Sequence, residues 1–276
     1  MKRPLAVLAV AALAATAALA GCSSPASTPS SNGSGVTLVK PGTLTVCTHL
    51  PFEPMEYRDA SGQVVGFEID LMNLVAAQLD ATVSIVEVDP PQMSSGTAMQ
   101  SGLCDIAAEG MTITDARAEA VNFSVPYFGV NQTLAVPTDS TITGLGDLSG
   151  KKVGVEASTT GDDYAKAVQD QYGFTIVSFD DGATLLNSLL TGSTDAVLFD
   201  AGYVGTFVRD NTGVKVAAQI ETGEVYGFAT AKDDNGAALI KIVNDVLAKA
   251  NSDGTYLKIW QTWIDPTATS ASLPSQ

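Results

Sequence analysis

One segment of the sequence combines residue types that can bind a carboxylate. Residues 110–117 read Gly-Met-Thr-Ile-Thr-Asp-Ala-Arg and follow a strand predicted at 104–108, and Thr114 is expected to be the N-cap of a short helix. Backbone N–H groups at a strand end, the Thr112 hydroxyl and the Arg117 guanidinium would together form an anion receptor. The same spacing equally fits a surface Arg117 that pairs with a nearby acid.

Strands and helices must position these residues, and the hydrophobic pattern indicates an α/β alternation. Segments rich in Val, Ile and Thr alternate with segments whose apolar residues recur at helical spacing. The alternation covers 42–108 and restarts near Asn131, which indicates two lobes, each with a mostly parallel sheet flanked by helices. Two amphipathic helices are predicted at 237–250 and 255–264.

The first 22 residues have the order of an export signal. Two cations precede an apolar run of about 16 residues, and the sequence Leu-Ala-Gly-Cys then resembles the lipobox of bacterial lipoproteins. We predict a lipoprotein signal peptide at 1–21 and lipidation at Cys22; the alternative is an ordinary secretory signal with an incidental Cys22. Residues 22–38 are rich in Ser, Pro and Gly and are predicted to form a flexible tether.

Composition narrows the classes of partner and chemistry. The chain has 30 Asp and Glu against 14 Lys and Arg, a formal charge of −16, which argues against nucleic acid as a partner. There is one His, and the sequence contains no nucleophile motif, phosphate loop or Ser/His/Asp grouping. We therefore predict no catalytic residues, no metal site and no cofactor.

Five blocks between Pro41 and Trp263 make the chain recognisable. They are GTLTVCTHLPFEPMEYRDASGQVVGFEIDL, SGLCDIAAEGMTITDARAEAVNFSVPYF, LSGKKVGVEASTTGDDYAK, STDAVLFDAGYV and DGTYLKIWQTW. In this order they resemble the polar amino-acid class of bacterial extracellular (periplasmic-type) solute-binding proteins of ABC transporters. The resemblance implies a two-lobed periplasmic-binding-protein-like fold with a two-strand hinge, in which the lobes close on a ligand.

The resemblance also implies how the chain divides. The expected parts are lobe 1 at 39–130 and 225–268 and lobe 2 at 131–224. Residues 269–276, rich in Thr, Ser and Pro, are predicted from their composition to form a disordered tail. The two crossings between the lobes would lie near 129–131 and 222–226.

Family members hold an amino-acid ligand through groups that match residues of this chain. The match implies that Arg117 binds the ligand carboxylate, helped by Thr112 and by the backbone at Thr160. The Gly110 carbonyl and the Asp200 carboxylate would bind the ligand ammonium, because a buried ammonium without partners is costly. Asp200 could instead serve only as the N-cap of the next helix, or it could do both.

Four positions are expected to contact the ligand side chain. The family match implies that Phe52 covers it. His49 stands where many relatives have Asp, Glu109 stands where a smaller residue is commoner, and Glu156 occupies a variable position. Two carboxylates would favour a cationic side chain, so we hypothesise arginine or lysine as the ligand. If the Glu side chains point to solvent, glutamine, histidine or another polar amino acid fits as well.

Cys47 and Cys104 are the two thiols that remain if Cys22 is acylated. An even pair in an exported protein indicates a disulfide. Cys47 lies near the end of its predicted strand and Cys104 near the start of its own, and the short reach of a disulfide speaks against the bond. The sequence leaves both readings open.

The sequence as a whole predicts a substrate-binding lipoprotein of an amino-acid ABC importer. It would be a monomer on the outer face of the bacterial cell membrane that delivers its ligand to a membrane permease, and it would not be an enzyme. Two alternatives remain. A dehydratase-like enzyme of the same fold could use His49, Glu109 and Glu156 as an acid/base set, and a ligand-sensing module could use the same closure.

Overall fold

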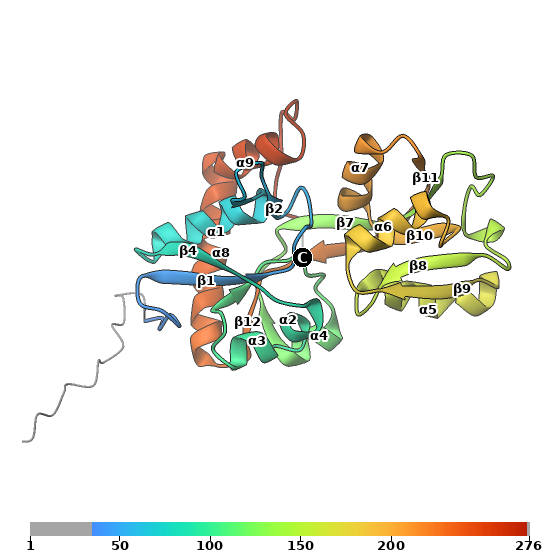
Figure 1. Cartoon of the computed structure of the whole chain (residues 1–276). Helices are drawn as coiled ribbons and strands as arrows, with labels where there is room; N and C mark the ends of the chain where they lie inside the picture. Colours follow the sequence, from blue (N-terminus) through green and yellow to red (C-terminus); the bar gives the residue numbers. More distant parts are fainter. Residues whose placement is uncertain (1–34, 275–276) are drawn as a thin grey trace, which may run out of the picture.

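The computed structural model describes residues 35–274 of the 276-residue chain. The predicted signal peptide at 1–21, the lipidation site Cys22 and most of the predicted tether lie outside the described residues. The described chain is a mixed α/β protein with two five-stranded sheets flanked by helices. The two lobes lie side by side and are connected by long strands (Figure 1).

The first lobe is built on a sheet with the strand order β4-β1-β5-β12-β6. β1 pairs in parallel with β4 and β5, and β12 alone runs against the other four strands. The five strands are β1 (Thr43–Thr48), β4 (Thr82–Glu87), β5 (Ile106–Ala107), β6 (Val121–Phe123) and β12 (Ala229–Ala231). A short hairpin is formed by β2 (Tyr57–Arg58) and β3 (Val64–Val65).

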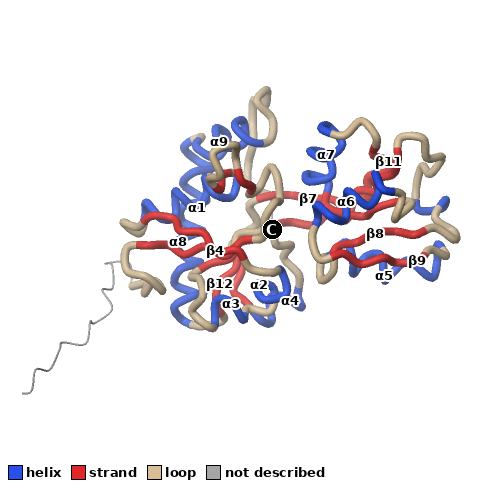
Figure 2. Tube along the Cα trace, viewed as in Figure 1, coloured by secondary structure: helices blue, strands red, loops and turns tan. Residues whose placement is uncertain are grey.

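The helices of the first lobe cover both faces of this sheet (Figures 1 and 2). They are α1 (Phe67–Gln78), α2 (Pro90–Ser94), α3 (Thr97–Gln100), α4 (Asp115–Ala120), α8 (Asp234–Asp253) and α9 (Thr255–Trp263). Asp233 caps α8 by accepting a hydrogen bond from the Gly236 N–H at 2.7 Å, and the left-handed Gly254 ends the helix. The two amphipathic helices predicted from the sequence correspond to α8 and α9.

The second lobe is built on a sheet with the strand order β11-β7-β10-β8-β9, in which β7 runs against the other four strands. Its strands are β7 (Phe128–Pro137), β8 (Lys152–Glu156), β9 (Thr175–Phe179), β10 (Ala196–Asp200) and β11 (Val214–Tyr226). Its helices are η1 (Leu145–Asp147), α5 (Thr160–Tyr172), α6 (Gly182–Thr191) and α7 (Ala201–Asp210). Each lobe thus has the mostly parallel sheet that the sequence predicted.

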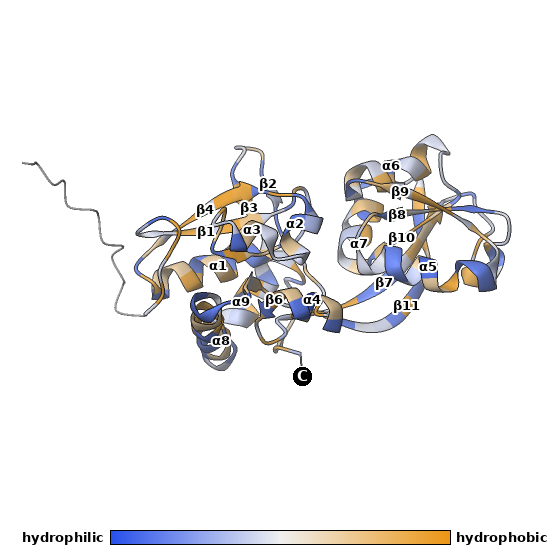
Figure 3. Cartoon of the chain, turned by 90° about the horizontal axis from the view of Figure 1, so that it is seen from below, coloured by the Kyte–Doolittle hydropathy of each residue, from blue (hydrophilic) through white to orange (hydrophobic). Residues whose placement is uncertain are grey.

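Alternating side chains fill a separate core on each face of each sheet. In β10, Leu198 joins one core of the second lobe, whereas Val197 and Phe199 join the other. In β1, Val46 and Cys47 divide in the same way between the two cores of the first lobe. Figure 3 shows the resulting pattern, with hydrophobic strands between helices whose outer faces are hydrophilic.

β7 and β11 connect the two lobes as an antiparallel pair, which Figure 3 shows crossing the gap between them. Along β7, Phe128 and Val130 belong to the core of the first lobe, whereas Leu134 belongs to a core of the second. The pairing with β11 is irregular between Ile220 and Glu224. The chain therefore passes from one core to the other within a few residues.

Two terminal segments differ from the sequence-based expectation. Val36 and Leu38 end the predicted tether, yet they are 1% and 7% exposed and belong to the first core. In the predicted disordered tail, Leu273 packs against the same core, and its N–H donates to Asn251 Oδ1 at 3.2 Å. The predictions of a flexible tether and a disordered tail rested on the polar composition of these two segments. A few apolar side chains in each segment are enough to hold it against the core.

Cys47 and Cys104 are joined by a disulfide, with an S–S distance of 2.02 Å and a Cα–Cα distance of 5.7 Å. Cys47 pairs in register with Ala107, and β5 begins only at Ile106. Cys104 therefore lies outside the regular ladder, and its position is not fixed by strand register. This removes the geometric objection raised by the sequence. Among residues 35–274, no helix is long and apolar enough to cross a membrane.

Candidate functional site

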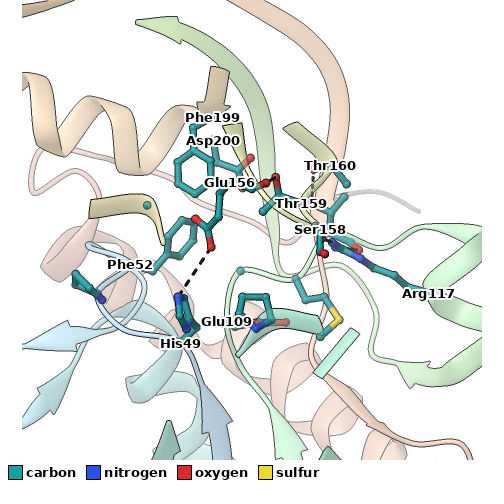
Figure 4. Close-up of a pocket in the computed structure, with 16 residues that line it drawn as sticks. His49, Phe52, Glu109, Arg117, Glu156, Ser158, Thr159, Thr160, Phe199 and Asp200 are labelled. Carbon is teal, nitrogen blue, oxygen red and sulfur yellow. Dashed lines mark hydrogen bonds and ion pairs between the residues drawn. The ribbon is translucent and has the colours of Figure 1, made fainter. Parts of the chain in front are cut away.

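A cavity lies between the two lobes. Every residue that the sequence singled out for ligand contact lines it: His49, Phe52, Glu109, Gly110, Thr112, Arg117, Glu156, Thr160 and Asp200. The members of this set that Figure 4 labels, among them His49 and Arg117 of the first lobe and Glu156 and Asp200 of the second, converge on the cavity. Several stand at the carboxyl ends of strands, where open α/β sheets place their ligands, since Glu156 and Asp200 are the last residues of β8 and β10.

Arg117 lies at one side of the cavity and reaches across to the other lobe. Thr114 caps α4 by accepting a hydrogen bond from the Arg117 N–H at 3.2 Å. The guanidinium donates from Nη1 to the Thr112 carbonyl at 3.0 Å and from Nη2 to the Ser158 carbonyl at 3.2 Å. Ser158 belongs to the second lobe and has a left-handed backbone with φ 67°. Both partners are neutral carbonyls, so the charge of Arg117 remains available to an anion, unlike in the surface ion pair weighed as an alternative.

The hydroxyls of Thr112 and Thr160 meet at 3.4 Å beside Arg117. Thr160 is the first residue of α5, and Thr159 caps this helix by accepting a hydrogen bond from the Asp162 N–H at 3.2 Å. The unpaired N–H groups at the start of a helix carry partial positive charge. This corner of the cavity is therefore suited to a carboxylate.

Asp200 is 7% exposed and faces the cavity from the end of β10. Its carboxylate accepts hydrogen bonds from Gln132 Nε2 at 2.5 Å and from the Tyr226 hydroxyl. Asp200 occupies the N-cap position of α7, but its side chain does not cap the helix. The pKa of Asp200 is raised to about 6, because burial and the charge of Glu224 outweigh the opposing effects of the two hydrogen bonds and of Arg117. The carboxylate is thus mostly ionised at neutral pH and is oriented for a cation.

His49 and Glu156 face each other across the cleft, with 3.9 Å between His49 Nε2 and Glu156 Oε1 (Figure 4). Glu156 is 4% exposed. Burial raises its pKa to about 8, with Asp181 and Asp200 as further causes. Burial also raises the pKa of Glu109 well above its usual range, although Arg117 lowers it. Both Glu side chains therefore lie on the cavity wall instead of in bulk solvent.

Phe52 forms an aromatic wall that contacts both lobes. Its ring stacks on Tyr203, with centroids 5.3 Å apart, and meets Phe199 edge to face at 6.0 Å. Gly110 lies directly against this ring, since a Cβ at this position would be 2.4 Å from Phe52 Cε1, and its φ of +61° also favours glycine. The cavity wall at this point requires a residue without a side chain.

The sequence did not single out several residues that complete the site. Gln132 is fully buried in β7 and donates to Asp200 and, at 3.0 Å, to Glu224. Tyr226, which lies in the second predicted crossing at 222–226, holds the second oxygen of Asp200. A buried carboxylate needs hydrogen-bond donors, and this was the signal that the sequence offered for Gln132 and Tyr226. It does not show which strands or helices supply the donors.

Two lobes with a polar cavity between them define the class of periplasmic-type binding proteins. The family model of bacterial extracellular solute-binding proteins, family 3, matches residues 44–266, and this chain belongs to that family. Its homologues are amino-acid-binding proteins of ABC transporters, so the resemblance stated from the sequence is confirmed.

Individual relatives show how closely the chain matches. A probable histidine-binding protein of Neisseria gonorrhoeae is 32% identical over 219 residues, which cover 78% of this chain and 80% of that protein. An ancestral arginine-binding protein solved with arginine has a TM-score of 0.75 and 36% identity, covering 81% of this chain and 98% of its own. An ancestral arginine-binding protein solved with glutamine has a TM-score of 0.76 and 35% identity, covering 82% and 99%.

Proposed function

We propose that this chain is the substrate-binding lipoprotein of an amino-acid ABC importer and that its ligand is an amino acid with a cationic side chain, arginine or lysine. It acts by binding and not by catalysis. One observation carries the proposal: a single interlobe cavity has the Arg117 guanidinium at one side and the carboxyl groups of Asp200, Glu109 and Glu156 on its other walls.

The α-carboxylate of the ligand lies in the corner formed by Arg117, Thr112 and the start of α5. The guanidinium can donate two parallel hydrogen bonds, and the Thr160 N–H adds the positive end of the helix dipole. The ligand ammonium binds Asp200 and the Gly110 carbonyl. Asp200 is supported for this role by its buried donors, which keep the carboxylate in one orientation.

The charge of the ligand side chain is the finer part of the proposal. The lining charges are one guanidinium against three carboxyl groups. Burial raises the pKa of both Glu109 and Glu156, and within residues 35–274 neither carboxyl has a Lys or Arg cation as an ion-pair partner. A guanidinium or ammonium from the ligand would supply that cation, and Phe52 would cover its aliphatic stem. His49 borders the same space and limits its size.

A neutral polar ligand is the alternative that a specific observation favours. An ancestral arginine-binding protein of the same fold was also solved with glutamine. Glutamine would fit this cavity if Glu109 and Glu156 stay protonated and donate hydrogen bonds to its side-chain carbonyl. The two ligands therefore differ in the protonation state that they require of Glu156.

Closure of the lobes would couple binding to transport. Lobe 1 is taken as 39–130 and 225–268 and lobe 2 as 131–224, and these lobes would rotate about the crossing of β7 and β11. The contacts from Arg117 to Ser158 and from Thr112 to Thr160 bridge the lobes. A ligand that adds contacts to both lobes favours the closed form, which would dock on a permease. The protein would act as a monomer, held through Cys22 at the outer face of the membrane.

The proposal is tested by isothermal titration calorimetry of the mature chain with each of the twenty amino acids. Arginine or lysine is expected to bind at one site, and R117A and D200N are expected to abolish this binding. The matched controls are R58A and D163N, because Arg58 and Asp163 are exposed and lie outside the cavity. Binding of arginine that survives R117A would refute the proposed carboxylate site.

A further inference from the structure

A fully buried acid, Glu68, lies behind the cavity wall and does not line the cavity. It stands in the first turn of α1, whose N-cap Gly66 offers no side chain. Its Oε1 accepts a hydrogen bond from the Gly110 N–H at 2.8 Å and another from the Tyr127 hydroxyl. Glu68 therefore binds the backbone of the residue whose carbonyl we assign to the ligand ammonium.

A second fully buried acid, Glu56, lies next to Glu68. Within residues 35–274, neither carboxyl forms an ion pair. Two adjacent carboxyl groups without a cation hold one negative charge between them. Burial and the nearby charges of Glu68 and Glu109 raise the pKa of Glu56 well above its usual range, so Glu56 keeps the proton of the pair and can donate it to the adjacent Glu68. This proton would join one Glu56 oxygen to Glu68 Oε2, which are two of the three oxygens of the pair that lack another hydrogen-bond partner.

The Gly110 backbone is thereby fixed on both sides of its carbonyl. Glu68 binds the Gly110 N–H on the preceding peptide, and on the following side the Met111 carbonyl accepts a hydrogen bond from the Gly227 N–H at 3.0 Å. The ring of Phe52 closes the space above the Cα atom. With both flanking peptides bound, the Gly110 carbonyl has one orientation along the cavity wall.

We propose that Glu68, hydrogen-bonded to the proton of Glu56, is a positioning residue that orients the Gly110 carbonyl toward the ligand ammonium. The inference rests on the proposed amino-acid function. A fully buried pair of acids is a costly way to fill a core, and apolar side chains of similar volume would usually make the lobe more stable. Stability therefore does not explain why the two acids are there. Their role in orienting a group of the binding site would explain it.

The test compares two ligands that differ only in the ammonium: arginine and its des-amino analogue, 5-guanidinopentanoate. Titration calorimetry is done on wild type, E68A and E68Q. E68A is expected to weaken the affinity for arginine by roughly tenfold or more, as expected for loss of a hydrogen bond to a charged group. The affinity for the analogue, which has no ammonium, is expected to fall much less. E68Q is expected to restore most of the arginine affinity, since its amide oxygen can accept the same N–H. The control is D105A, because Asp105 also accepts two backbone N–H groups in this lobe but lies outside the cavity.

Equal weakening of both ligands by E68A would overturn the inference, because a merely structural role moves both alike. If E68A does not fold, the amide proton of Gly110 decides by NMR. It is expected far downfield in wild type, where the acceptor is a carboxylate, and less far downfield in E68Q, where a neutral amide oxygen accepts the same N–H more weakly. An unchanged shift would show that Glu68 does not bind this N–H and would overturn the inference. Wild-type protein that binds none of the twenty amino acids would refute the proposed function. The Gly110 shift would still report the hydrogen bond to Glu68, so the two failures can be told apart.

Discussion

The affinity for arginine should rise steeply with pH, and Glu156 is the residue that makes it do so. In the ligand-free protein, burial and the neighbouring acids raise its pKa to about 8, so the carboxyl is protonated at pH 6. A bound guanidinium stabilises the carboxylate and lowers that pKa toward its ordinary value. Binding therefore releases a proton, and the affinity increases as the pH rises.

The magnitude follows from the fraction of ionised Glu156 in the ligand-free protein. With a pKa of about 8, roughly 1% is ionised at pH 6 and half at pH 8, so the association constant should increase about fifty-fold between these pH values. Deprotonating the carboxyl at pH 6 costs about 2.7 kcal/mol of binding free energy. Ionisation of Glu109, which faces the same cavity, adds to the effect in the same direction.

The assay is titration calorimetry with arginine from pH 6 to pH 8.5, repeated in two buffers of different ionisation enthalpy so that released protons are counted. At pH 6.5 Glu156 should release about one proton per arginine, and any ionisation of Glu109 adds to this number. E156Q should bind arginine more weakly at pH 8 and show a flatter pH profile. The variant H49N separates any contribution of the imidazole that faces Glu156.

Glutamine serves as the internal control, since its neutral side chain does not need an ionised Glu156. Its affinity should change little over this range or fall as Glu156 ionises. An arginine affinity that is constant from pH 6 to pH 8, with no proton release, would refute the placement of the cationic group against Glu156. An identical pH profile in E156Q would assign the effect to another residue.

Three further results are expected. G110A should abolish binding and destabilise the fold, because its Cβ would be 2.4 Å from Phe52 Cε1; thermal melts and titration check this, and wild-type affinity would contradict it. Reducing the Cys47–Cys104 disulfide, which spans 57 residues, should lower the free energy of unfolding by about 4 kcal/mol in the entropy model, as measured by urea denaturation with and without reductant; unchanged stability would count against the bond. The unfolding free energy of the ligand-free protein should fall as pH rises from about 4.5 to about 8, because the unfolded chain loses the Glu156 proton first; the Glu156 part is at most about 5 kcal/mol and should be absent in E156Q, so equal pH slopes in both proteins would refute it.

The family resemblance supplied most of the residues that line the cavity, and positional rules agree with several of them. Glu156 and Asp200 end strands, and the ends of parallel strands meet at one edge of a sheet. The family resemblance supplied the roles expected of Arg117 and Gly110. Local signals also fixed the α4 cap, since Thr114 precedes a helix as its residue type suggests.

What the sequence did not reveal depends on tertiary convergence. Gln132 points toward Asp200 only because β7 and β10 pair in one register, and a shift by one residue would turn it to the other face. Glu68 looks like an ordinary acid in the first turn of a helix, and nothing local shows that it is buried beside Glu56. The buried Val36 was missed because composition describes a segment as a whole and not one side chain within it.

The central claim is that this cavity holds an amino acid with a cationic side chain between Arg117 and the buried acids. The most direct test is calorimetric titration of the mature wild-type protein at pH 8, first with arginine and then with glutamine. Arginine, or lysine in its place, is expected to bind at a single site and more tightly than glutamine. Tight binding of glutamine with no heat from arginine or lysine would contradict it.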